Sequence, residues 1–385
     1  MCLGTPFFVA KGSDDLAQEF SILAKLKLNT KDIQNQLNAL QNKTISIGAD
    51  TKDFDMSISV ANAVLNKFLD TAGAMVDQVY ELDKSLTEFK KVSDLRGSGL
   101  EKYTEQLSEA AEITARTTSQ MVDAATMFRK SGFTDKEAAD LAVVATAFQN
   151  VADTEISASQ AAASIVSQIQ AFGRGAMEPI HIIDAYNEVA NHFAVGTNDL
   201  SRALELSAAG MATYGNTFEE VIGLVTAGTE IMVGRSAQVA RGLNTISANI
   251  VANSGVLQKY GIQVKSANGD LKSTYDVLAE LKPVWDNLTD AERQALGQTL
   301  AGKNQYRVLA SVMQNFDHGV EATTTALNSE GSAMEENAAY MESLNKMGLL
   351  KIALTAGTSL ELSLLSYIGD NIMAIGNAKG IVKRR

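Results

Sequence analysis

Six helix-start signals recur along this chain and constrain its fold more than any other feature. In each, a Ser or Thr is followed three residues later by Glu or Gln. This is the capping-box pattern, in which the two side chains bind backbone amides that have no partner inside the helix. Three of the signals fall in a central stretch from Phe133 to Met232. The six pairs are Ser98/Glu101, Thr117/Gln120, Thr134/Glu137, Ser157/Gln160, Thr217/Glu220 and Thr289/Glu292.

Apolar residues in the central stretch have helical spacing. Two runs repeat at i, i+3, i+4 and i+7 and a third at i, i+4, i+7 and i+11, so each segment has one face to bury. The runs are Leu141/Val144/Ala145/Phe148, Phe218/Val221/Ile222/Val225 and Ile182/Tyr186/Val189/Phe193. Glycines that follow such runs predict C-terminal caps, and Pro179 fits a first helical turn. These glycines are Gly132, Gly173, Gly196 and Gly215.

Proline usage points to the same class. The chain has 385 residues and three prolines, and more than 170 residues separate Pro6 from Pro179. Ala, Leu, Glu, Gln and Lys dominate that interval, and few residues in it would break a helix. With 45% hydrophobic residues the chain can bury a substantial core, and its length suggests two or three domains.

Net charge and cysteine usage exclude several classes. A formal charge of −12 argues against a general binder of the phosphate backbone, and no sequence-specific contact with nucleic acid is expected. The single Cys2 excludes an internal disulfide framework and a cysteine-built zinc site. The start has only a short apolar run and no basic region before it, so no secretory signal is predicted.

Two regions outside the central stretch carry other patterns. Period-two alternation at Lys25–Leu28 and Thr44–Asp50, on either side of the helical Lys31–Gln41, predicts a small strand-helix-strand unit. From Met56 to Leu95 the apolar spacing is helical, which predicts one long helix or two nearly collinear ones.

A small β-hairpin is predicted within the helical region. Gly261-Ile262-Gln263-Val264 leads to Asn268-Gly269, and Leu271 follows. Asn-Gly between alternating apolar runs is a strong hairpin signal, since both residues tolerate positive φ.

The predicted fold is mainly α, an elongated multi-helix array with long helices, this inserted hairpin and the N-terminal strand-helix-strand unit. The predicted segments are a small α/β segment at 1–55, a connector helix at 56–95, a helical core at 96–316 and an apolar helical segment at 317–385.

The order of elements resembles a known family. Gly261-Ile262-Gln263-Val264 and Asn268-Gly269-Asp270-Leu271 precede Leu278-Ala279-Glu280-Leu281, Leu288-Thr289-Asp290-Ala291-Glu292-Arg293 and Leu300-Ala301-Gly302. Upstream, Ser131-Gly132-Phe133-Thr134, Ala138-Ala139, Ala171-Phe172 and Ile183-Asp184 occur in the matching order. Over roughly Leu95 to Phe316 the chain resembles the TP901-type core of phage tail tape measure proteins; the ordered set carries the resemblance, because no single motif in it is specific.

The resemblance implies a structural, non-enzymatic role. Family members lie in the lumen of the tail tube, set tail length while tube subunits polymerise around them, and leave when DNA is ejected. The implied partners are the tail tube protein, tail assembly chaperones and proteins of the tail tip or baseplate, with assembly in the host bacterial cytoplasm. The apolar faces of Met56–Leu95 and Met334–Ile368 further predict a homo-oligomer.

The reach of the chain bears on that role. A fully helical chain of this length extends roughly 580 Å, at 1.5 Å per residue, and a compact core would reduce this. Many family members are longer, so the chain is expected to be a fragment, a processed form or a tape measure shortened in its extended part.

The C-terminal segment leaves an alternative open. Gly348–Gly369 contains nine Leu or Ile residues and only Lys351 and Glu361 as charges. The aliphatic residues contribute roughly −3 to −5 kcal/mol to membrane insertion, and Glu361 alone opposes this by about 2.5 kcal/mol or more. The segment is expected to pack or self-associate. The alternative is a membrane-active helical protein that forms a pore or delivery channel and contacts the host membrane during ejection.

No catalytic, cofactor-binding or metal-binding residues are predicted. The chain has no HExxH, GxxxxGK[ST] or GxSxG motif. His181 and His192 share a helical face but lie roughly 16 Å apart, too far to bind one metal ion. Asp184 could orient His181, yet no nucleophile is near, and an i, i+3 helix pair is common. Gly173-Arg174-Gly175 could contact an anion, although a helix-helix connector fits the glycines better.

Overall fold

The computed structural model describes residues 78, 80–173, 175 and 178–346. By its contacts the chain divides into two compact units, Met1–Tyr80 and Glu81–Arg385, and everything below concerns the second. Its described part is mainly helical, as predicted. Residues 80–89 are helical, and the helices after them are α3 (Ser98–Ala111), η1 (Glu112–Thr114), α4 (Thr118–Lys130), α5 (Asp135–Val151), α6 (Ala158–Phe172), α7 (Pro179–His192), α8 (Thr197–Thr213), α9 (Phe218–Ile231), α10 (Ser236–Ala252), α11 (Ser254–Gln258), α12 (Thr274–Asn287), α13 (Asp290–Gln314), α14 (Phe316–Leu327) and α15 (Ser332–Lys346).

Five of the predicted capping boxes are confirmed. In each, the Ser or Thr accepts the amide at the third helical position and the Glu or Gln accepts the amide of the cap residue, at the starts of α4, α5, α6, α9 and α13. The sixth prediction is wrong: α3 begins at Ser98 itself, and its cap position is Gly97, with no side-chain hydrogen bond. A residue inside the first turn cannot cap that turn, because its own backbone is already helical.

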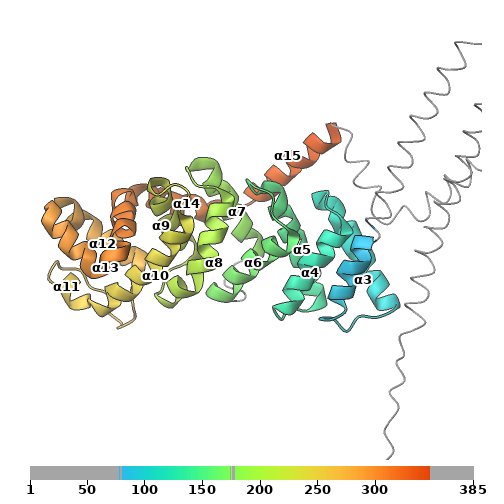
Figure 1. The fold of residues 1–385 in the computed structure, drawn as a ribbon, viewed down its shortest axis with the longest axis horizontal. Coiled ribbons are helices and arrows are strands. Elements are labelled where there is room, and N and C mark those ends of the chain that lie inside the picture. The colour runs from blue at the N-terminus through green and yellow to red at the C-terminus, as the bar shows by residue number, and fades with distance from the viewer. Residues whose placement is uncertain (1–77, 79, 174, 176–177, 347–385) are drawn as a thin grey trace, which may run out of the picture. The chain divides into compact units, whose positions relative to one another are not determined.

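Helix α9 is the centre of the core. Every residue from Val221 to Thr229 is buried, so this helix has no solvent-facing side over that length. It packs against α14, α8, α13 and α10 (Figure 1). The predicted periodic run Phe218, Val221, Ile222 and Val225 is buried, as expected, but the burial extends around the whole helix.

Two glycines let α14 approach α9 closely. A Cβ built on Gly223 would lie 2.0 Å from the Thr323 hydroxyl and 2.4 Å from the Gly319 carbonyl oxygen. One built on Gly319 would lie 2.9 Å from the carbonyl oxygen of Gly223. These distances are far below van der Waals contact, so the two helix backbones pack directly against each other at this crossing.

The chain runs outward through this unit and then returns. Helices from α3 to α13 pack successively on their neighbours, α4 on α5 and α6, α6 on α8, α8 on α10 and α10 on α13. The last two helices reverse this course, since α14 packs on α9 and α7 and α15 packs on α7 and α5 (Figure 1). Helices that are far apart in sequence therefore become neighbours along the return.

Several sequence predictions are corrected. The hairpin is reduced to one isolated antiparallel bridge between Lys265 and Leu271, and the described residues contain no extended strand pair. Only Gly269 of the Asn-Gly pair has positive φ, so the turn lacks the twist that would extend a ladder. Gly196 is extended and precedes α8 instead of capping α7. One feature of the helices was not addressed by any prediction: α13 is kinked at Gly302, where φ is 70°.

Other predictions fall partly or wholly outside the described residues. The N-terminal strand-helix-strand unit lies in 1–55, and the apolar segment Gly348–Gly369 follows α15; both are outside. Of the predicted long helix Met56–Leu95, residues 80–89 are helical, but the chain turns at 90–92 and is not helical at 93–96. That helix therefore ends earlier than its apolar spacing suggested.

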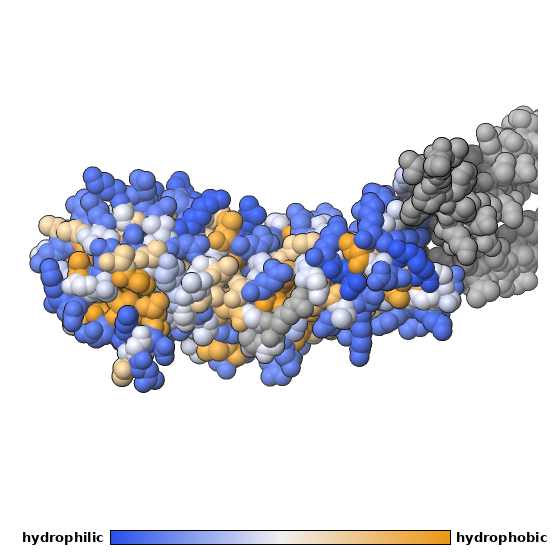
Figure 2. All heavy atoms as spheres, turned by 90° about the horizontal axis from the view of Figure 1, so that it is seen from below, coloured by the Kyte–Doolittle hydropathy of each residue, from blue (hydrophilic) through white to orange (hydrophobic). Residues whose placement is uncertain are grey.

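The surface of the described part is mixed. Figure 2 shows polar residues interspersed with apolar areas on the face in view. The most exposed large apolar side chains include Val233, two residues after α9, and Leu327, the last residue of α14. Among the helices of the described residues, none is both long and apolar enough to cross a lipid bilayer.

Candidate functional site

The residues singled out from the sequence do not form one site. His181 pairs with Glu219, with 2.9 Å between Nε2 and Oε1, while Asp184 accepts hydrogen bonds from backbone amides more than 140 residues later. His181 and Asp184 therefore have different hydrogen-bond partners. His192 bonds the carbonyl oxygen of Glu188, one turn earlier in α7. Within the described part of the chain, no three His, Cys, Asp or Glu side chains are grouped as a metal site would require.

The central helix α9 is fastened near each end by a His–Glu contact. At its first turn Glu219 binds His181 of α7, and at its last turn Glu230 binds His318 of α14, with 3.0 Å between Nδ1 and Oε2. Glu230 also accepts the side-chain amide of Asn315. The hydrogen bond that His181 donates to Glu219 raises the pKa of His181 against the opposing effect of burial. Burial alone would raise the pKa of Glu219, but its hydrogen bonds, including that with His181, hold this pKa below its usual range.

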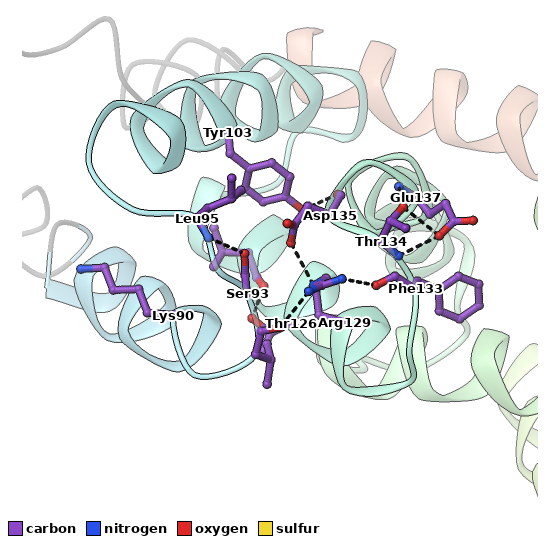
Figure 3. Close-up of polar contacts among 12 residues, drawn as sticks. Lys90, Ser93, Leu95, Tyr103, Thr126, Arg129, Phe133, Thr134, Asp135 and Glu137 are labelled. Carbon is purple, nitrogen blue, oxygen red and sulfur yellow. Dashed lines mark hydrogen bonds and ion pairs between the residues drawn. The ribbon is translucent and has the colours of Figure 1, made fainter.

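A cluster around Arg129 fastens the start of the unit (Figure 3). The guanidinium donates to the carbonyl oxygen of Phe133 in its own α4–α5 turn and to that of Val92, 3.0 Å away. Its Nε lies 2.9 Å from a carboxylate oxygen of Asp135, the first residue of α5. Arg129 therefore joins the segment before α3 to the α4–α5 turn, and its planar donor set suits several oxygens at once.

The segment around this cluster is held by further contacts. Arg96 donates to the carbonyl oxygens of Ser93 and Lys90, at 2.8 and 2.9 Å, and so closes the turn after residue 89. Phe89 is fully buried and stacks on Tyr103 of α3, with ring centroids 4.9 Å apart. The Tyr103 hydroxyl donates to the carbonyl oxygen of Asp135, and burial raises the pKa of this phenol. We call residues 89–96 with Arg129 the entry anchor.

A second anchor holds α15 at the end of the unit. The carboxylate of Asp184 in α7 accepts the backbone amides of Gly331 and Ala333, at 3.0 and 2.9 Å, and so caps α15 from a distant part of the chain. Burial raises the pKa of Asp184, and the two amides oppose that rise. The Ser332 hydroxyl donates to Glu188, at 2.6 Å, and accepts the side-chain amide of Asn187.

Farther along α15, Asn337 forms the second half of this anchor. It is buried, accepts the side-chain amide of Asn150 in α5 at 2.6 Å, and donates to the carbonyl oxygen of Ile113 at 3.1 Å. Arg116 lies over the ring of Tyr340, 6.0 Å from its centroid. We call the contacts of Asp184, Asn187, Glu188, Asn150, Ile113 and Arg116 with residues 331–340 the exit anchor.

The two anchors share neighbours. The entry anchor is built on α3, α4 and the start of α5, and the exit anchor reaches η1 and α5 with its C-terminal half. All the contacts of both anchors are made within this chain, to its own backbone and side chains. The two anchors therefore attach the first and last described segments of the unit to neighbouring helices, with α5 in common.

Sequence reasoning missed both anchors. The capping-box search finds pairs three residues apart, whereas α15 is capped by Asp184 and α8 by Asp153, whose carboxylate accepts the backbone amide of Thr197 at 2.5 Å. At Gly196 and Gly331 a glycine precedes the helix without a local capping box, and in both places a distant carboxylate supplies the cap. The identity of that cap follows only from the tertiary fold.

Comparison with known proteins identifies the family. Residues 101–302 match the family described as phage-related minor tail proteins. The chain is 24% identical over 330 residues to the tape measure protein of Pneumococcus phage Dp-1; the match covers 82% of this chain and 28% of that protein. The chain thus spans less than a third of the length of this relative, and no solved structure is significantly similar to it. The family match covers more than half of the chain, including α4 to α12 entire, so the chain belongs to the family of phage-related minor tail proteins.

Proposed function

We propose that this chain acts as part of a tail tape measure, a non-enzymatic component that lies in the lumen of the tail tube and sets tail length. The observation that carries the proposal is the match of 82% of the chain to a protein named as a tape measure protein. The resemblance in motif order points the same way. Because the chain spans 28% of that relative, the length-setting function would belong to the whole protein of which this unit is a part.

The proposed partners follow from the same role. The tail tube protein would polymerise around the extended parts, tail assembly chaperones would keep apolar faces from aggregating, and tail tip or baseplate proteins would start the tail. We further propose assembly in the host bacterial cytoplasm, self-association of the chain, and release through the tube during DNA ejection. The proposed segments remain 1–55, 56–95, 96–316 and 317–385.

Tail length measured by electron microscopy tests the proposal. Removing 28 residues in frame from 56–88, upstream of the entry anchor, should shorten tails by about 42 Å if the segment is helical. The matched control is Gly99→Ala, which leaves chain length unchanged and should leave tail length unchanged. Tails of normal length from the deletion would contradict a length-setting role for this segment. Failure of both variants to give tails would point to an assembly defect unrelated to length.

A further inference from the structure

Helix α15 is held differently from the rest of the unit. Of its side chains from Ser332 to Ser343, only Ala333 and Asn337 are buried. Helix α9, in contrast, is buried along every residue from Val221 to Thr229. Apolar burial is the main stabilising contribution to packed helices, so α15 has much less of it than the core helices have.

Instead of apolar burial, a few polar contacts hold α15, and they lie in two groups along the helix. One group lies at the first turn, where Asp184 and Glu188 of α7 bind the backbone and hydroxyl of residues 331–333. The other is Asn337 with Asn150 and Ile113. Polar contacts of this kind exchange readily for contacts with water, because both sets of groups can be hydrated once the helix leaves.

The chain geometry permits this departure. Gly331, between α14 and α15, has φ of 87°, a conformation that glycine adopts without strain, so the backbone can turn there. Most of the named partners of α15 belong to α5 and α7, which pack against each other as well, so these two helices keep contacts when α15 is absent. Loss of α15 would therefore leave the core around α9 intact.

We propose that α15 is a releasable strap, a helix that detaches from α5 and α7 as one cooperative unit while α3 to α14 stay folded. Asp184 is the latch of this strap, because one carboxylate satisfies two amides at the helix start and nothing else in the described residues caps α15. In the docked state the strap holds residues 331–340 against α7, η1 and the end of α5. In the released state the chain after α14 extends freely from Leu327.

This inference deepens the proposed function and rests on it for its biological meaning. A unit within a tape measure is connected to chain on both sides, and a strap that yields first would lengthen the molecule without unfolding its core. The release itself is a property of the free protein, so it can be tested without tails.

Hydrogen exchange of the full chain, followed by mass spectrometry, tests the strap. Amides of residues 336–346 should open about 100-fold more often than those of residues 221–229, since locally opening segments exchange well before global unfolding. Asp184→Asn replaces one acceptor oxygen with an amide that faces an N–H donor. It should raise exchange in 336–346 about 10-fold and leave 221–229 unchanged.

Two further variants complete the test. Glu335→Gln removes a charge from the exposed face of α15 and should change neither region, which controls for net charge. Asn337→Ala should raise exchange in 336–346 even if Asp184→Asn folds poorly. Equal exchange of 336–346 and 221–229 in the unsubstituted protein would overturn the proposal. So would a parallel rise of both regions in Asp184→Asn and Asn337→Ala. A tail-length experiment that failed would leave these exchange rates unaffected, so the two proposals fail separately.

Discussion

Substituting Gly223 with alanine should destabilise the unit although it improves helix propensity. The added Cβ would lie 2.4 Å from the Gly319 carbonyl oxygen, whereas ordinary contacts begin at 3.4 Å, so α14 must move by the difference of about 1 Å. It would also lie 2.0 Å from the Thr323 hydroxyl, which bonds the Gly319 carbonyl oxygen and cannot turn away without losing that bond.

The magnitude follows from two opposing effects. Overpacking a closely packed contact costs about 1–3 kcal/mol, and a backbone atom as the obstacle places this site near the upper value. A 1 Å separation of the helices also weakens the dispersion contacts between them by up to about half. Alanine in place of glycine returns about 1 kcal/mol through helix propensity. The expected net loss is about 2 kcal/mol in the free energy of unfolding.

Denaturant unfolding of the full chain, followed by circular dichroism, measures this loss. Gly99→Ala is the matched control, since Gly99 lies in α3 and its added Cβ would meet only the Leu95 side chain at 3.6 Å. That variant should be unchanged or more stable by up to about 1 kcal/mol. If Gly223→Ala were as stable as Gly99→Ala, the close approach of α9 and α14 would be refuted.

Three further perturbations have defined outcomes. Thr289→Ala removes a confirmed capping box and should cost about 1 kcal/mol in unfolding experiments, whereas Ser98→Ala should be nearly neutral because Ser98 caps nothing; equal effects would contradict the assignment. The pKa of His181 is raised from its ordinary value of 6.5, and the pKa of Glu219 is lowered from its ordinary value of 4.5. Their contact therefore contributes most to the stability of the fold between pH 4.5 and pH 6.5. The stability difference between the unsubstituted protein and His181→Gln should therefore shrink as pH rises from about 6 to 8, and a difference that grew over this interval would be inconsistent with the contact. Arg129→Lys keeps the charge but loses the planar donor set, so it should make residues 90–96 several-fold more sensitive to trypsin, while Lys136→Gln on the exposed start of α5 should not.

The sequence predicted what depends on local chemistry. Thr117, Thr134 and Thr217 cap helices because their partners lie three residues away, and the periodic run from Phe218 to Val225 is buried because helical spacing places those residues together. The same reasoning placed Pro179 in the first turn of α7. Each of these depends on a single helix, so no knowledge of the tertiary fold was needed.

What the sequence could not predict depends on distant partners. The role of Asp184 follows from α15 returning across α7, and nothing in the spacing of residues around Asp184 indicates that role. Complete burial of α9 arises because helices on all its sides surround it, and the spacing of its own apolar residues does not show this. The hairpin failed for a different reason: Asn268 keeps an ordinary φ, so the Asn-Gly pair forms a turn without extending a ladder.

The outward and returning course of the helices has a consequence for how such a unit contributes to distance. The first described segment of the unit packs against α3 and α4, and its last helix packs beside η1 and α5. The distance between these two segments is therefore set by the few helices on which both pack. While α15 is docked, helices α8 to α13 add almost nothing to the distance between the first and last described segments. The residues from Ser98 to Lys346 would reach roughly 370 Å as one continuous helix. Adding residues to this folded region would therefore not lengthen the molecule. Only residues in an extended segment add to its length.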